Sequence, residues 1–178
     1  MDANNKPEGQ PQQELGTAKP RPGFWKILLW VLSSAFVLLL LAAIIVPNFL
    51  RSCRVVANQA SAVGSLRTLN TAEITYSSTY NSGFSATLTY LQPGTAANPS
   101  STAAGLIDSV LASGSKSGYR FTYSAGPPNK SGVIETYSII AIPVDPSRTP
   151  NFYYTDQSGV IRQNATTTAS STDSPLAG

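Results

Sequence analysis

Residues Ile27 to Val46 form the feature that most constrains how this chain can fold. The run of about 20 residues contains no charged residue, no glycine and no proline, and its only hydroxyl side chains are Ser33 and Ser34. An α-helix rises about 1.5 Å per residue, so the run covers about 30 Å, the thickness of the hydrocarbon core of a bilayer. A helix buried in a soluble core would need apolar segments around it, and the rest of the chain supplies too few. The sequence therefore predicts a transmembrane helix over residues 24–50.

A removable secretory signal is the alternative interpretation of this run. Signal cores usually span about 7–15 apolar residues and end at a cleavage site of small residues. This run is longer, and it continues into Val-Pro-Asn-Phe-Leu-Arg, so a retained membrane anchor is favoured. Basic residues lie on both sides of the run, so charge alone does not predict its orientation; they are Lys19, Arg21 and Lys26 before it and Arg51, Arg54 and Arg67 after it.

Composition excludes several classes of function. The chain has 178 residues, a net charge of +3, 12% charged residues and no histidine. Its basic residues are scattered, whereas a nucleic-acid interface needs a concentrated basic face, so no nucleic-acid partner is expected. The absence of histidine removes the commonest general base and the commonest transition-metal ligand. No P-loop, zinc spacing or nucleophile elbow is present. We expect no enzymatic activity, no cofactor and no metal site.

Cys53 is the single cysteine, so no disulfide can form within the chain. It lies close to the predicted membrane boundary. An intermolecular disulfide and acylation are alternatives that rest on this position alone. An unmodified thiol is the favoured interpretation.

The chain divides into four parts by its patterns. Residues 1–23 are a polar arm or leader, predicted to be disordered. After the anchor, apolar residues recur at helical spacing over residues 51–80, which predicts an amphipathic helix continuous with the anchor. Pro47 lies between the two halves and predicts a bend, because it removes one backbone hydrogen bond. Residues 51–164 form the predicted globular domain, and residues 165–178 a disordered tail.

The globular domain is predicted to have an α+β fold. Residues 84–112 form a loop with a short helix near residues 104–111. Residues 118–163 contain four period-two segments, which predict a small four-stranded antiparallel sheet; the strands are expected at 119–124, 136–144, 152–155 and 160–163. A sheet and an amphipathic helix bury their apolar faces against each other. The helix residues predicted to dock the sheet are Val55, Val63, Leu66 and Leu69.

The order of these parts resembles the type IV pilin and type II secretion pseudopilin family. The closest local likeness lies in residues 42–51 and 57–73, and the predicted last hairpin at 152–162 is also similar. The resemblance covers about residues 24–164. It implies a long helix that serves as a membrane anchor and later as a filament core, with a small antiparallel sheet covering its second half. Pro47 looks like the helix-weakening proline of that family.

The N-terminal end of the run both matches and departs from the pilin pattern. Gly23-Phe24 looks like the site where prepilin peptidase removes the leader. The family then carries an acidic residue inside the apolar run, thought to meet the free amine of a neighbouring subunit. In this chain that position is Leu28, and the helix has no acidic residue before Glu73.

The resemblance implies a structural subunit anchored in the bacterial inner membrane by a single span. Its C-terminal domain would lie on the periplasmic or extracellular side. It would self-associate or join other pilin-like subunits in an envelope filament or secretion pseudopilus, and its other partners would be membrane lipid, prepilin peptidase and assembly platform proteins. The alternative, favoured by the missing acidic residue and the long polar arm, is a non-polymerising membrane-anchored binding module with a pilin-like domain.

Three further sites were weighed for chemistry. Ser113 to Lys116 fits the S-x-x-K pattern of penicillin-recognising hydrolases, but the K-S-G pattern overlaps on the same lysine, so a chance match is favoured. Glu73 is expected to cap loop amides rather than to act in acid–base chemistry. Asp156 with Ser158 could contribute to a calcium site, although too few oxygen ligands are visible in the sequence.

Overall fold

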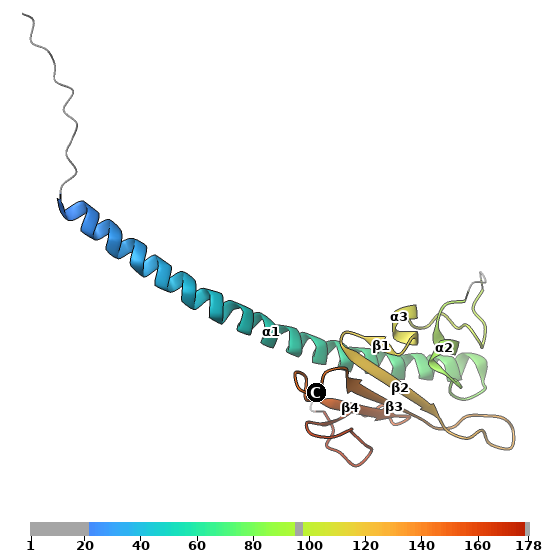
Figure 1. The fold of residues 1–178 in the computed structure, drawn as a ribbon. Coiled ribbons are helices and arrows are strands. Elements are labelled where there is room, and N and C mark those ends of the chain that lie inside the picture. The colour runs from blue at the N-terminus through green and yellow to red at the C-terminus, as the bar shows by residue number, and fades with distance from the viewer. Residues whose placement is uncertain (1–21, 95–97, 177–178) are drawn as a thin grey trace, which may run out of the picture. The chain divides into compact units, whose positions relative to one another are not determined.

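The computed structural model describes residues 22–94 and 98–176. The chain forms two compact units, the first ending at Asn48 and the second beginning at Phe49. One helix, α1 (Pro22–Tyr80), contributes to both units (Figure 1). It contains Pro47 in its interior. The predicted arm, residues 1–23, lies outside the described residues except for Pro22 and Gly23, which open α1. The helix thus begins two residues earlier than predicted, since proline is favoured in the first helical turn.

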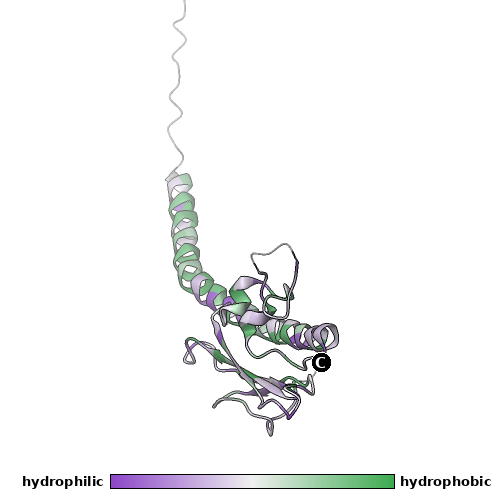
Figure 2. Ribbon diagram, turned by 90° about the vertical axis from the view of Figure 1, so that its right-hand side faces the viewer, coloured by the Kyte–Doolittle hydropathy of each residue, from purple (hydrophilic) through white to green (hydrophobic). Residues whose placement is uncertain are grey.

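The first unit contains only the N-terminal part of α1 among its described residues. All of its side chains from Gly23 to Asn48 are exposed, and Figure 2 colours most of this part as apolar. α1 is long and apolar enough to cross a membrane, by length and composition, and the most apolar part of it has no buried residue. The predicted transmembrane segment, residues 24–50, lies entirely within α1.

The second unit contains a five-stranded antiparallel sheet with the order β1-β2-β3-β4-β5 (Figure 1). Its strands are β1 (Ser115–Lys116), β2 (Tyr119–Ala125), β3 (Tyr137–Pro143), β4 (Phe152–Asp156) and β5 (Arg162–Asn164). The prediction of four strands is therefore wrong by one, because β1 was missed. β1 pairs with β2 across Ser117 and Gly118, which have φ of 51° and 75°. Two positive φ values are typical of a type I′ hairpin turn, and a two-residue strand is too short to show alternation.

The sheet buries one face against the second half of α1. Residues alternate between buried and half-buried along β3 and β4, and the first four residues of β2 alternate between buried and exposed. The shared hydrophobic core includes Leu66 and Leu69 from α1 and Tyr119, Ile139 and Tyr153 from the sheet. On the other face of β3, Ile140 and Ile142 are only half-buried. The helix covers one face of the sheet, so the unit has two layers.

Two short helices lie in the segment between α1 and the sheet. The predicted helix at residues 104–111 is shorter than expected: α3 covers only Ser109–Ala112, with the Asp108 side chain accepting a hydrogen bond from the Leu111 N–H. Leu106 and Ile107 instead donate their N–H groups to the carbonyl of Leu91. That leucine ends a further helix, α2 (Leu88–Leu91), which was predicted as loop.

The C-terminal tail differs from its prediction as a disordered segment. Its described residues, as far as Leu176, fold back along β5. The Leu176 N–H donates to the Ile161 carbonyl at 2.7 Å, and the Gln163 N–H donates to the Ser174 carbonyl at 3.1 Å. Ala169 is buried. The segment is polar in sequence, yet it covers the backbone edge that β5 would otherwise leave open.

Candidate functional site

The predicted helix–sheet contact is concentrated in three of its four residues. Leu66 and Leu69 are fully buried, and Val63 is 9% exposed; all three belong to the core cluster that contains the sheet residues. Val55 is half-buried and lies outside that cluster. It lines a groove together with Gly118 and Val144. The close packing of helix on sheet therefore begins about two turns beyond Val55.

Glu73 is buried in the middle of this contact. Its two carboxylate oxygens accept hydrogen bonds from Ser85, one from the backbone N–H at 2.8 Å and one from Oγ at 2.6 Å. The Tyr123 hydroxyl donates to the Ser85 carbonyl at 2.7 Å. The prediction that Glu73 caps loop amides is confirmed. The carboxylate ties the loop after α1 to the helix, and Tyr123 ties the same loop to β2.

The electrostatics of Glu73 follow from this burial. The residue lies 27 positions beyond Val46 in the sequence, far outside the apolar run. Burial raises the pKa of its carboxyl above the ordinary value of 4.5, and the hydrogen bonds from Ser85 offset part of that rise. Burial, followed by the nearby charge of Glu73, also raises the pKa of the Tyr123 and Tyr137 phenols. Both phenols therefore stay protonated and act as donors.

Asn70 is a second buried polar contact, and sequence reasoning missed it. Its amide nitrogen donates to Thr155 Oγ1 at 2.9 Å, and its amide oxygen accepts from the Tyr137 hydroxyl at 3.0 Å. The signal was available, because Asn70 falls between Leu66 and Glu73 on the buried side of the helix. Buried polar groups need specific partners, so Asn70 and Glu73 select one register of helix against sheet.

The residues considered for chemistry are occupied by structural contacts. Ser113 Oγ donates to the Val110 carbonyl at 2.6 Å, while Lys116 Nζ pairs with Asp108 at 2.8 Å. The serine and the lysine of the S-x-x-K pattern thus have separate partners. Asp156 accepts from the Ser158 N–H at 2.9 Å and closes the turn between β4 and β5. In residues 22–94 and 98–176 no group of three or more His, Cys, Asp or Glu side chains gathers in one place.

The candidate processing site lies in the first turn of α1. Gly23 and Phe24 are exposed, and nothing lies within 4 Å of the position that a Gly23 side chain would take. The first turn has no acidic residue, and Leu28 occupies the position where the pilin pattern has a carboxylate. Pro47, the predicted bend, is the proline inside the helix.

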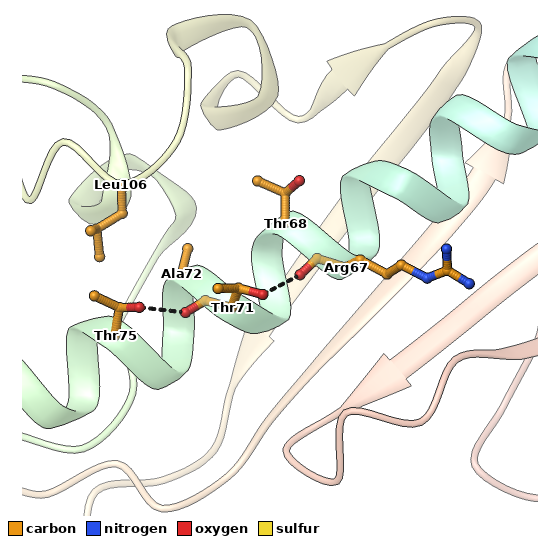
Figure 3. A pocket seen from close by; sticks show the side chains of 6 residues that line it. All are labelled: Arg67, Thr68, Thr71, Ala72, Thr75 and Leu106. Carbon is orange, nitrogen blue, oxygen red and sulfur yellow. Dashed lines mark hydrogen bonds between the residues drawn. The ribbon is translucent and has the colours of Figure 1, made fainter. Parts of the chain in front are cut away.

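A shallow hollow of about 330 Å³ lies on the side of α1 shown in Figure 3. Its lining residues are Arg67, Thr68, Thr71, Ala72, Thr75 and Leu106. The three threonine hydroxyls donate to carbonyls one turn earlier in the helix, at 2.8–3.0 Å. The threonine hydroxyl donors are therefore already used within the helix and are not available to a ligand in the hollow.

A second, larger groove of about 670 Å³ lies at the beginning of the second unit. α1 contributes Arg51, Ser52, Arg54, Val55 and Asn58 to it, and the loops beside the sheet contribute Gly118, Val144, Asp145, Arg148 and Thr149. This groove gathers arginines that are far apart in the sequence. In the sequence Arg51 and Arg54 stand out only as flanking charges of the apolar run, and no local pattern links them to Arg148.

Comparison of the chain with protein-family models, with curated proteins and with solved structures found no match.

Proposed function

We propose that the chain is a non-enzymatic, pilin-like structural subunit. In this proposal Ile27 to Val46 anchors it by a single span in the bacterial inner membrane. The globular domain lies on the periplasmic or extracellular side. The subunit assembles with its own copies or with other pilin-like subunits into an envelope filament or a secretion pseudopilus.

One observation carries the proposal: α1 is apolar and exposed on all sides before Pro47, and buries one side under the sheet after it. An apolar helix exposed on every side needs a cover, and lipid supplies it for a membrane-resident subunit. Packing among the helices of neighbouring subunits can replace lipid, since helix association in that environment depends on van der Waals contact. The sheet, by contrast, already covers one side of the helix from about Ala62 onward within each subunit.

The resemblance to pilins and pseudopilins suggests the remaining steps. A prepilin peptidase would cut after Gly23, and a platform protein with a cytoplasmic motor would extract the subunits from the membrane. Pro47 would let the helix adjust between its membrane and assembled states, because its ring removes one hydrogen bond from the ladder.

The second candidate function is a non-polymerising, membrane-anchored binding module. Leu28 and the absence of an acidic residue from the first turn of α1 favour it. A buried pair of carboxylate and amine sets register between subunits more than it adds stability. A chain without that carboxylate lacks this way of aligning its neighbours.

Sequencing the N-terminus of the mature protein, together with shearing of the cell surface, tests the two candidates. The assembly proposal expects a mature start at Phe24, and expects the protein in the sheared filament fraction. Gly23→Val should block processing, while Gly64→Ala, on an exposed part of α1 with open space around it, should leave processing unchanged. An intact Met1 and a protein confined to membrane monomers would overturn assembly in favour of the resident module.

A further inference from the structure

The large groove of the second unit combines positive charge from two distant parts of the chain. Arg51 and Arg54 project from α1, and Arg148 comes from the connection between β3 and β4. Arginine is the side chain best suited to bind phosphate, because its planar guanidinium can donate two parallel hydrogen bonds. Three such groups on one groove are an arrangement that the fold creates, since Arg148 lies far from the others in sequence.

The positive charge of the groove is only partly neutralised. Asp145 is the one carboxylate among the lining residues, and it pairs with Arg148 Nε at 3.0 Å. Among residues 22–94 and 98–176, no carboxylate forms an ion pair with Arg51 or Arg54, and both are exposed. Three guanidinium groups against one carboxylate leave a formal charge of about +2 on the lining.

The groove also has an apolar part. Val144 is 64% exposed and Val55 is half-buried, and both line the same groove as the arginines. A site for a free inorganic anion has no use for exposed valines. A ligand that joins an anionic head to an apolar body uses both parts of this lining.

The place of the groove along the chain identifies that ligand. Arg51 and Arg54 follow Val46, the end of the apolar run, by five and eight residues in the sequence, so they are flanking charges of the proposed membrane span. The polar headgroup region of a bilayer extends about 5–8 Å beyond each side of the hydrocarbon core. Basic side chains that flank a membrane span extend their charged ends toward this headgroup region, so lipid phosphates are the anions expected next to Arg51 and Arg54.

We propose that this groove binds the phosphate headgroup of an anionic phospholipid, held by Arg51, Arg54 and Arg148, with Val55 and Val144 against its apolar part. The proposal rests on the membrane anchoring in the proposed function and does not depend on assembly into a filament. Asp145 holds Arg148 at the groove. Its pKa is lowered by the hydrogen bond from Ser147 and by the neighbouring Arg148, so the carboxylate is charged at neutral pH and orients that guanidinium.

The test uses the full chain in nanodiscs of phosphatidylcholine that contain increasing fractions of phosphatidylglycerol. Native mass spectrometry after release from the nanodisc counts the phosphatidylglycerol molecules retained by each protein. We expect the wild-type chain to retain phosphatidylglycerol over phosphatidylcholine, and Arg54→Gln and Arg148→Gln each to reduce that retention about 3- to 10-fold. Arg120→Gln is the matched control, because Arg120 is an exposed arginine of β2 that does not line the groove.

Each outcome of this experiment decides one point. Equal retention of the two lipids by the wild-type chain, or a phosphatidylglycerol preference unchanged in Arg148→Gln, would overturn the lipid site. Loss of bound lipid on addition of a few millimolar inorganic phosphate would overturn the lipid assignment in favour of a free-anion site. Failure of the wild-type chain to enter phosphatidylcholine nanodiscs would instead overturn the membrane anchor of the proposed function. Insertion of the chain without a preference for phosphatidylglycerol would leave the proposed membrane anchor intact and would overturn only the lipid site in the groove.

Discussion

The two halves of α1 belong to one continuous helix but differ in how many of their side chains are buried. Before Pro47 every described side chain from Gly23 onward is exposed, and no charged residue interrupts the run from Ile27 to Val46. After Pro47 the helix is one-sided, with Leu66 and Leu69 fully buried while Ile74 stays 62% exposed. The first half carries no buried polar contact, whereas the second carries Asn70 and Glu73. A uniform apolar surface suits a fluid environment such as lipid, and specific polar contacts suit one fixed partner such as the sheet.

The largest effect is expected from removing a side chain at the centre of the helix–sheet contact. Leu66→Ala should lower the free energy of unfolding of the globular domain by about 2–5 kcal/mol, since it leaves a cavity in the core. Ile74→Ala, on the exposed side of the same helix, should change it by no more than about 0.5 kcal/mol. Urea unfolding of the full chain in detergent, followed by near-ultraviolet circular dichroism, measures both. Equal effects of the two variants would contradict the one-sided second half.

Membrane insertion of the first half of α1 should depend on the charge of its side chains more than on their volume. Leu38→Asp places a carboxylate near the middle of the apolar run, which costs about 2.5–3.5 kcal/mol of membrane insertion. Leu38→Ala is the control, because it shortens the side chain without adding charge and should still insert. A membrane-insertion assay with glycosylation reporters measures the inserted fraction. Full insertion of the aspartate variant would remove the case for a lipid-facing segment.

Removing the buried carboxylate of Glu73 should lower the free energy of unfolding by a smaller amount. Glu73→Ala leaves the Ser85 N–H without its acceptor and leaves Ser85 Oγ with only longer hydrogen bonds, such as the one to the Thr87 carbonyl at 3.1 Å, at a cost of about 1–3 kcal/mol in unfolding free energy. Glu135→Ala removes an exposed glutamate with one hydrogen bond, from Asn129, and should cost less than about 0.5 kcal/mol. Thermal unfolding of both variants at pH 7 makes the comparison. No loss in the Glu73 variant would show that the loop is held without this cap.

Glu73 also predicts a pH dependence whose sign can be derived. Its pKa is higher in the folded state than the ordinary 4.5, so the folded protein binds more protons from this group than the unfolded chain does. Stability from this group is therefore complete below about pH 4.5, and is lost as pH rises through the raised pKa. Hydrogen bonds lower the pKa of Asp108, Asp145 and Asp173, so these groups act in the opposite direction and lose stability in acid, below about their ordinary value of 3.8.

Comparing the wild-type chain with Glu73→Gln isolates this group, because the aspartates are the same in both. The wild-type unfolding free energy minus that of Glu73→Gln should fall as pH rises from about 4 to 8. Urea unfolding at several pH values over that range measures the difference. A difference that stays flat or rises with pH would contradict the raised pKa of the buried carboxyl.

The smallest change in the free energy of unfolding is expected at Val55, which precedes the close helix–sheet contact. Val55→Ala should cost less than about 1 kcal/mol, because the side chain is half-buried and lies outside the core cluster. Val63→Ala, one of the core residues, should cost more, by about 1–2 kcal/mol. The urea midpoints of the two variants show which substitution destabilises the domain more. The reverse order would place the beginning of the contact nearer Pro47.

Much of the fold follows from patterns that are local in the sequence. The extent of the apolar run, the one-sided spacing of Val63, Leu66 and Leu69, and the alternation along β2 each depend on residues within a few turns or one strand. Glu73 was also assigned to loop capping correctly, because a carboxylate inside an apolar stripe needs donors nearby. The five-strand count was missed, since the two residues of β1 are too few to show a period.

The amino-acid sequence by itself determined the long helix α1, the strands β2, β3 and β4, and which half of α1 is apolar on every side, because periodicity and length are properties of neighbouring residues. Only the tertiary structure decided that Ser85 meets Glu73, that the tail runs along β5, and that Arg148 joins Arg51 and Arg54. Those contacts join residues that lie far apart along the chain. These pairings depend on the fold of the whole domain, and no local pattern in the sequence predicts them.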